Sequence, residues 1–93
     1  MEDADAALAR VRRVVCDPVR SRIIWALSDG PRSVDELARR VGRTPAGTSQ
    51  HLRVLRELGI VESKKAGRLR RYRLCPGGDG ERVVELLRLM QAA

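Results

Sequence analysis

The sequence has 93 residues, which suits one small domain over residues 1–93 and leaves a core too small for a large enclosed pocket. Its 19 Lys and Arg residues outnumber 12 Asp and Glu residues, and this charge favours a polyanionic partner, either nucleic acid or an anionic membrane surface. Two cysteines are too few for a disulfide-stapled secreted protein, the start "MEDADAALARVRR" lacks the pattern of a signal peptide, and no apolar run reaches membrane-spanning length. We therefore expect a cytoplasmic protein.

Two helices are predicted in the first third of the chain. Residues 4–15 carry apolar side chains at helical spacing, and Pro18 ends the pattern because proline disfavours helix at the residue before it. Asp17 can cap a second helix that has Pro18 at its first position, and the turn sequence at residues 29–31 ends that helix.

A helix-turn-helix is predicted next. Ser33 and Glu36 form a capping box at the start of a third helix, because each side chain can accept a hydrogen bond from the other residue's backbone N–H. Gly42 ends this helix, and a Thr-Pro pair soon afterwards starts a fourth helix over residues 45–58. Two helices joined so tightly form a helix-turn-helix, which we place at residues 33–58.

The fourth helix has two unlike faces when its residues are placed at 100° steps. One face is small and polar and holds Ala46, Ser49, Gln50, Arg53 and Glu57, whereas the other holds Thr48, Leu52, Val54, Leu55 and Leu58. Short side chains permit close approach to DNA, and Ser, Gln and Arg can hydrogen-bond to base edges in the major groove. The alternative is an ordinary solvated helix face.

The segment after this helix favours DNA. Two strands are predicted over residues 60–74 with a turn at residues 66–68, and this hairpin sets one acid, Glu62, against six Lys and Arg residues. Charged surfaces normally mix both signs. A polar helix face followed by a basic hairpin is the plan of a winged helix-turn-helix, in which the helix reads bases and the wing holds the backbone or enters a flanking minor groove.

The predicted fold is therefore mainly α with a small β-hairpin wing (α+β), with about five helices and a two-stranded antiparallel wing. Its expected partner is double-stranded DNA and not a membrane. The predicted DNA-binding residues are Thr44, Pro45, Ala46, Ser49, Gln50, Arg53, Lys64, Lys65, Arg68, Arg70 and Arg71.

Three segments together carry a family resemblance. "DPVRSRIIWAL", "SVDELARRVG" and "TSQHLRVLRELGIVESKKAGRLRRYRL" occur in the order and spacing of the ArsR-SmtB repressors, and the resemblance covers about residues 10–90. It implies a dimeric winged-helix regulator that represses an operon by binding an imperfect inverted repeat. Members of the family often release DNA when a metal or metalloid ion binds, whereas others respond to oxidants or sulfur species or have no known effector.

The metal sites of that family are absent from the matching positions. The chain has Ser33 and Asp35 where the arsenic and cadmium sensors have cysteines. Its last helix contains no histidine, unlike the zinc and nickel sensors, and offers only Glu81 and Glu85 as oxygen donors. A borderline-soft divalent ion requires about four N or S donors. We therefore expect no metal and no cofactor.

Three other side chains have structural interpretations with a functional alternative. His51, the sole histidine, is expected to be satisfied and partly buried beneath the recognition face, with a DNA-backbone contact as the alternative. Cys16 and Cys75 are expected to behave as small hydrophobic residues. The alternative is a thiol pair, activated by neighbouring cations, whose oxidation alters the dimer and makes the protein a redox-responsive regulator of the same fold.

A homodimer is expected because the last helix, residues 81–92, carries more apolar side chains than one face of a small monomer can hide. This helix and the helix at residues 4–15 are the predicted dimerisation helices. The predicted interface residues are Leu8, Val11, Val15, Val83, Leu86, Leu87 and Met90. Two recognition helices would then meet successive major grooves of one duplex.

Other classes of function are weaker. No Ser-His-Asp or Cys-His pairing and no phosphate-binding glycine loop is indicated, so we do not expect an enzyme. A winged helix can also serve as a protein-protein or RNA-binding module, because a fold does not dictate its use.

Overall fold

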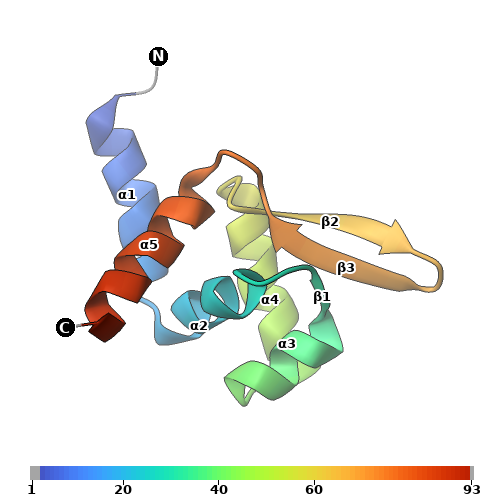
Figure 1. Cartoon of the computed structure of the whole chain (residues 1–93). Helices are drawn as coiled ribbons and strands as arrows, with labels where there is room; N and C mark the ends of the chain where they lie inside the picture. The colour runs from blue at the N-terminus through green and yellow to red at the C-terminus, as the bar shows by residue number, and fades with distance from the viewer. Residues whose placement is uncertain (1–2, 93) are drawn as a thin grey trace.

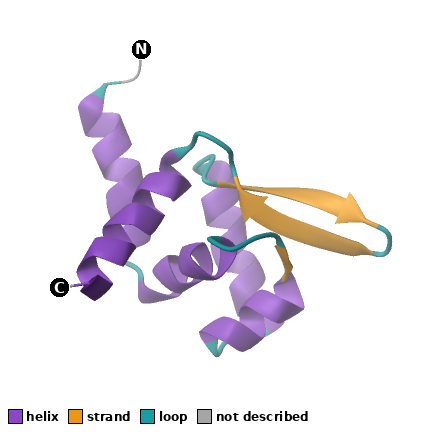
Figure 2. Ribbon diagram, viewed as in Figure 1, coloured by secondary structure: helices purple, strands orange, loops and turns teal. Residues whose placement is uncertain are grey.

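The computed structural model describes residues 3–92, and these residues form five helices and three strands (Figure 1). In chain order the elements are α1 (Ala4–Val15), α2 (Pro18–Leu27), β1 (Arg32–Ser33), α3 (Val34–Val41), α4 (Pro45–Glu57), β2 (Val61–Ala66), β3 (Leu69–Leu74) and α5 (Asp79–Ala92). Helices α1 and α5 lie side by side, and the β2–β3 hairpin projects from the opposite side of the molecule (Figure 2). The predicted mainly α fold with a small β wing is confirmed.

Side-chain caps define where the helices of the middle segment begin. The Asp17 carboxylate accepts two backbone N–H groups at the start of α2, at 2.9 and 3.1 Å. Both hydrogen bonds of the capping box between Ser33 and Glu36 are present at the start of α3. The Thr44 hydroxyl accepts a backbone N–H in the first turn of α4 at 3.1 Å. These caps satisfy N–H groups that have no partner inside the helix, so α2, α3 and α4 begin where the sequence predicts.

Two glycines with positive φ make the sharp turns of the helix-turn-helix and of the wing. Gly42 has a φ of 69° and ends α3 in the left-handed conformation, which lets α4 begin three residues later. Gly67 has a φ of 65° and starts the tight turn between β2 and β3. A side chain at either position would be strained, so the helix-turn-helix and the wing both depend on glycine for their shape.

The sheet contains a strand that the sequence did not predict. Its order is β1-β3-β2 and both pairings are antiparallel. Strand β1 has two residues, with Arg32 opposite Tyr72 and Ser33 opposite Arg71, which is too short to produce an alternating pattern in the sequence. Pairing to β3 therefore makes the wing part of a three-stranded sheet and joins it to the start of α3.

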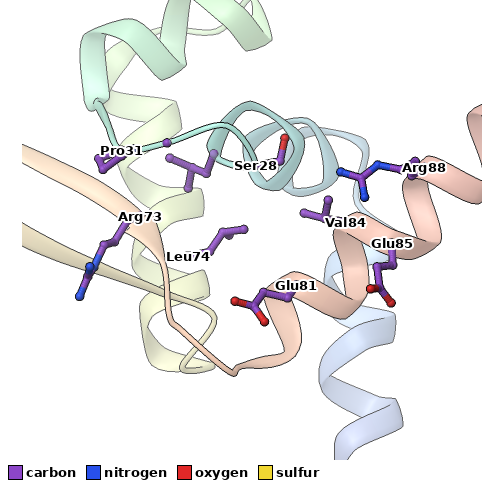
Figure 3. A pocket seen from close by; sticks show the side chains of 10 residues that line it. Ser28, Pro31, Arg73, Leu74, Glu81, Val84, Glu85 and Arg88 are labelled. Carbon is purple, nitrogen blue, oxygen red and sulfur yellow. The ribbon is translucent and has the colours of Figure 1, made fainter.

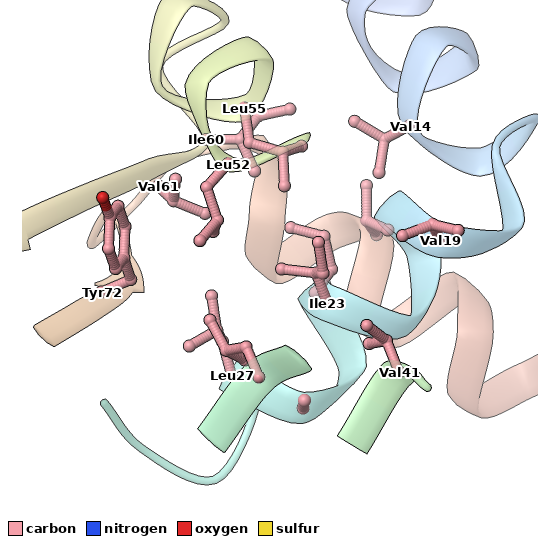
Figure 4. Packing of buried hydrophobic residues seen from close by; sticks show 14 of the residues in the cluster. Val14, Val19, Ile23, Leu27, Val41, Leu52, Leu55, Ile60, Val61 and Tyr72 are labelled. Carbon is pink, nitrogen blue, oxygen red and sulfur yellow. The ribbon is translucent and has the colours of Figure 1, made fainter. Parts of the chain in front are cut away.

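The hydrophobic core surrounds α2, which packs against the other four helices and against β3 (Figure 4). Its largest fully buried side chains are Val14, Ile23, Ile24, Leu37, Leu52, Leu55, Ile60 and Val83. Tyr72 of β3 is also buried and joins the base of the wing to this core. The apolar face of α4 is thus fixed inward, and its polar face must point away from the core.

Helix α5 differs from its prediction in two respects. It begins at Asp79 and not at residue 81. Val83 is 0% exposed within the single chain, so the prediction that it lies in a dimer seam is wrong. The physical reason is that apolar residues lie on more than one side of α5, and the side with Val83 and Val84 is already covered by the core of its own chain.

Candidate nucleic-acid interface

The two faces of α4 divide as predicted. The five residues of the polar face are all exposed, namely Ala46, Ser49, Gln50, Arg53 and Glu57. On the opposite face Thr48, Leu52 and Leu55 are buried, and Val54 and Leu58 are half-buried. Arg53 is 81% exposed, and its one ion pair within residues 3–92 is with Glu57 one turn later, at 3.4 Å. Such a surface pair is worth about 0–1 kcal/mol, so the Arg53 guanidinium can exchange this partner for another anion.

Thr44 and Pro45 at the beginning of α4 are exposed, and the first turn contains no acidic side chain. The free N–H groups of a helix N-terminus carry partial positive charge, so this end of α4 favours an anion. Arg43 directly precedes the cap and lines a shallow hollow together with Thr44, Gly47 and His51.

The prediction overlooked three cations near this end of α4. Arg39 and Arg40 occupy the last turn of α3, Arg43 lies in the turn, and all three are exposed. The sequence signal was present in "ARRVGRT", where Arg is the only charged residue type. The region between α3 and α4 therefore carries basic residues that were not among the predicted DNA-binding residues, most of whose cations lie in the wing.

His51 lies between α4 and the start of α2. It is half-buried as predicted, but its Nδ1 atom has no hydrogen-bond partner within residues 3–92, so the expectation of a satisfied side chain is wrong for that atom. The Nδ1 atom lies 3.9 Å from Oδ2 of Asp17. Burial raises the pKa of Asp17, but hydrogen bonds from the backbone N–H groups at the start of α2 and the nearby His51 outweigh this effect and lower it. The Asp17 carboxylate thus caps α2 and also lies close to His51 of α4.

The wing carries its unpaired charge near the tip. Lys64, Lys65 and Arg68 are exposed, and within the part of the chain that is described none of them makes an ion pair or a side-chain hydrogen bond. Arg70 donates a hydrogen bond of 2.9 Å to the Ser63 hydroxyl on the neighbouring strand. These cations can approach an anion without first breaking an ion pair.

Two other wing arginines have acidic partners. Arg73 at the base of the wing pairs with Glu62 on β2. Arg71 has its Nη1 atom 3.7 Å from Oε1 of Glu36 in α3. The DNA-binding role predicted for Arg71 must therefore compete with an ion pair inside the protein.

Helices α1 and α5 lie side by side, and both expose apolar side chains. The large ones are Leu8 of α1 and Leu86, Leu89 and Met90 of α5. Val11, Val15 and Leu87, which were also predicted for the seam, are half-buried and pack against the core of their own chain. The residues available to a partner are thus mainly those exposed four.

A shallow groove lies between the end of α2, the base of β3 and α5 (Figure 3). Leu27, Leu74 and Val84 form its apolar part, and Glu81 and Glu85 lie along its α5 side. Arg73 and Arg88 line the same groove. Because carboxylates and guanidinium groups share this open surface, the two acids of α5 do not form an isolated cation site.

Comparison with known proteins identifies the family to which this fold and surface belong. A family model described as "Helix-turn-helix domain" matches residues 15–64, more than half of the chain. The chain is 37% identical over 91 residues to the HTH-type transcriptional regulator CmtR of Mycobacterium tuberculosis, and the match covers 98% of this chain and 77% of that protein. The chain belongs to the ArsR-SmtB family of winged helix-turn-helix transcriptional regulators.

Solved structures agree with this assignment. The transcriptional repressor BigR from Xylella fastidiosa superposes with a TM-score of 0.76 at 33% identity, covering 88% of this chain and 84% of that chain. A homodimeric winged helix-turn-helix DNA-binding domain from Mycobacterium bovis, described as a possible ArsR-family regulator, has a TM-score of 0.73 at 29% identity and covers 99% and 85%. This ArsR-SmtB protein is a DNA-binding transcriptional regulator, and its family is not one of enzymes.

Within residues 3–92, no three His, Cys, Asp or Glu side chains come together in a way that could hold a metal ion. None of the helices over the same residues is long and apolar enough to cross a membrane.

The two cysteines have different surroundings. Both are free, with Cys16 exposed and Cys75 half-buried. Burial raises the pKa of the Cys75 thiol, and the neighbouring Glu62 raises it further, against a smaller opposing effect of Arg73. The alternative in which nearby cations lower the pKa of Cys75 is therefore not supported, because burial and Glu62 together outweigh the arginine.

Proposed function

We propose that the chain is a homodimeric repressor that binds an inverted-repeat operator in double-stranded DNA and acts in the cytoplasm. The observation that carries this proposal is that α4 exposes a polar face directly after an acid-poor turn. The wing contacts α4 through β2 and carries, near its tip, cations that make no ion pair among residues 3–92. A DNA duplex presents base edges between two phosphate backbones, and this surface offers groups for both.

Base reading is assigned to the exposed face of α4 in the major groove. Ser49, Gln50 and Arg53 supply hydrogen-bonding groups, and Ala46 is small enough to permit close approach. Thr44 and Pro45, at the start of the same helix, would lie against the backbone together with Arg43.

The wing supplies contacts that depend on charge more than on sequence. Lys64, Lys65, Arg68 and Arg70 are the cations for the phosphate backbone or a flanking minor groove, since they are exposed and, among residues 3–92, make no ion pair. Neutralised phosphates release counterions, so binding should weaken steeply with salt.

Dimerisation is assigned to α1 and α5. Leu8, Leu86, Leu89 and Met90 form an exposed apolar surface on a small chain, and burying such a surface favours association. The related domain from Mycobacterium bovis is homodimeric. A two-fold dimer presents two copies of α4 to one side of a duplex, which is the reason to expect an operator with two similar half-sites.

Repression is proposed by analogy with BigR, which is a transcriptional repressor. A protein that occupies a promoter through two helices and two wings blocks access to that DNA without a further domain.

Selection from a random duplex library followed by gel-shift titration tests this function. We expect an enriched inverted repeat that binds the dimer at least about 10³-fold more tightly than random duplex. The proposal would be overturned if no sequence were enriched, or if the chain bound random duplex or RNA as tightly as the selected repeat.

A further inference from the structure

The joint between the wing and the first helix of the helix-turn-helix contains an acid that the DNA-binding surface does not use. Glu36 lies at the third position of α3, where its Oε1 atom accepts the backbone N–H of Ser33 at 3.3 Å. The same oxygen lies 3.7 Å from Nη1 of Arg71 in the wing. One carboxylate thus contacts both the start of α3 and strand β3.

Backbone pairing brings these groups together. Ser33 is the residue of β1 that stands directly opposite Arg71 of β3. The Glu36 carboxylate therefore adds a side-chain contact at a point where α3 and the wing are already joined by the ladder. A change in the angle between the wing and α3 would therefore act on two contacts, the ladder and the Glu36–Arg71 pair.

A second arginine holds the other side of the same carboxylate. Arg32 has its Nη1 atom 3.7 Å from Oε2 of Glu36. Arg32 is itself fixed, since its Nε donates to the Ala26 carbonyl at 2.9 Å and its Nη2 pairs with Asp29 at 3.0 Å. One oxygen of the carboxylate therefore lies beside an arginine that has fixed partners of its own, and the other oxygen lies beside Arg71 of the wing.

The cross-strand neighbour of Arg71 gives a reason for a carboxylate at this point. Its direct cross-strand neighbour in the wing is Lys64, and like charges placed opposite one another repel. Hydrogen bonds from Ser33 lower the pKa of Glu36, and the nearby Arg71 and Arg32 lower it further, so the carboxylate is ionised at neutral pH and balances this repulsion.

We propose that Glu36 is a positioning residue that fixes the direction of the wing relative to α4, and that Arg71 serves this joint and does not contact a phosphate. The inference rests on the proposed binding of DNA by α4 and the wing together. Helix α4 packs on α3, so a carboxylate that ties α3 to β3 sets how far apart the two DNA-contacting elements stand.

The test compares Glu36→Gln, Arg71→Gln and the double variant, in each of which Gln replaces a charged side chain. Binding to the selected inverted repeat is measured at several salt concentrations. Glu36→Gln keeps an oxygen for the capping box and removes only the charge. We expect Glu36→Gln and Arg71→Gln each to weaken binding by up to roughly fivefold, the size of a surface ion pair, and the double variant to be no weaker than Arg71→Gln. The salt slope should stay that of the wild type in all three, because no phosphate contact is lost.

Two matched variants calibrate this result. Asp35→Asn changes the net charge by the same amount as Glu36→Gln at the exposed neighbouring position, so it measures the effect of charge alone. Arg68→Gln removes a wing cation that makes no ion pair within residues 3–92, and it should reduce the salt slope by about 0.9. If Arg71→Gln reduced the slope as Arg68→Gln does, or if Glu36→Gln bound more tightly than Asp35→Asn, Arg71 would be a DNA contact and the proposal would be overturned.

A measurement without DNA separates this inference from the proposed function. Residual dipolar couplings of the amides in β2, β3 and α4 report the wing direction in the free protein. We expect the couplings of Asp35→Asn to fit the same alignment as those of the wild type. The wing couplings of Glu36→Gln should be smaller than those of the wild type, because the direction of the wing is no longer fixed. Unchanged couplings in Glu36→Gln would overturn the positioning role even if DNA binding were fully established, whereas absence of DNA binding by the wild type would overturn only the proposed function.

Discussion

Arg10 in α1 and Asp79 at the start of α5 form an ion pair in which Nη2 and Oδ2 lie 2.8 Å apart. The Asp79 side chain is only 11% exposed, and its other oxygen accepts a hydrogen bond of 2.8 Å from Arg82. This pair joins the first and last helices, which carry the exposed apolar residues assigned to the dimer. The hydrogen bond from Arg10 is the main reason that the pKa of Asp79 lies below its ordinary value of 3.8.

Replacing Asp79 with Asn should lower the free energy of unfolding by about 1 kcal/mol at neutral pH, because it leaves Arg10 without this charged partner. Since the folded pKa is lower than the unfolded one, this contribution is complete above the unfolded value and is lost as the pH falls through the folded pKa. The difference between wild type and Asp79→Asn in thermal unfolding should therefore shrink below about pH 4. Glu85→Gln is the control, since it removes the same charge from an exposed position on the same helix and leaves the Arg10–Asp79 pair in place. A difference that persists at pH 2 would contradict the ion-pair explanation.

Replacing Ser49 or Gln50 with Ala should weaken binding to the selected inverted repeat by about 1–3 kcal/mol and leave binding to random duplex almost unchanged. The reason is that base-edge hydrogen bonds discriminate sequence, whereas phosphate contacts do not. Fluorescence anisotropy on both duplexes measures the two affinities. Equal losses on both duplexes would remove these side chains from the reading face.

Replacing Arg68 with Ala should weaken binding to specific and random DNA alike, because its guanidinium is expected to meet a phosphate. The plot of log affinity against log salt concentration should become flatter by about 0.9. A loss confined to the specific duplex would mean that the wing tip reads bases, contrary to the assignment.

Replacing Leu89 with Glu should dissociate the dimer, since it would bury an unpaired carboxylate in an apolar interface. Operator affinity should fall with it, because each half-site would then be bound separately. Sedimentation velocity measures the oligomeric state. Leu69→Glu is a matched control, as Leu69 is an exposed leucine on the wing and its replacement should leave the oligomeric state unchanged. An unchanged dimer in Leu89→Glu would refute the assigned seam.

Cys75 should react slowly with a thiol reagent and only at alkaline pH, because burial raises its pKa and the thiolate is the reactive form. The exposed Cys16 should react first when the Cys16→Ser and Cys75→Ser variants are compared. Mild oxidation should then leave operator affinity unchanged. A loss of affinity on oxidation that Cys75→Ser abolishes would restore the redox-responsive alternative.

Several features of this protein could be predicted from the sequence because they depend on neighbouring residues. The caps at Asp17, Ser33 and Thr44 are local hydrogen bonds, so the starts of α2, α3 and α4 follow from a few residues each. The two faces of α4 follow from helical periodicity alone. The basic wing follows from composition, because few acids stand near it in the sequence.

Other features depend on residues that are distant in the chain, and only the tertiary structure decided them. Strand β1 forms because Arg32 and Ser33 pair with residues of β3 that are distant in the chain. Val83 is core and Leu89 is surface because of where the rest of the chain packs on α5, although both are apolar in the sequence. In the sequence, Arg71 and Arg68 are equivalent cations of the wing, and only the fold places Arg71 beside Glu36. The physical reason is the same in each case: burial and ion pairing are set by partners that periodicity and composition cannot locate.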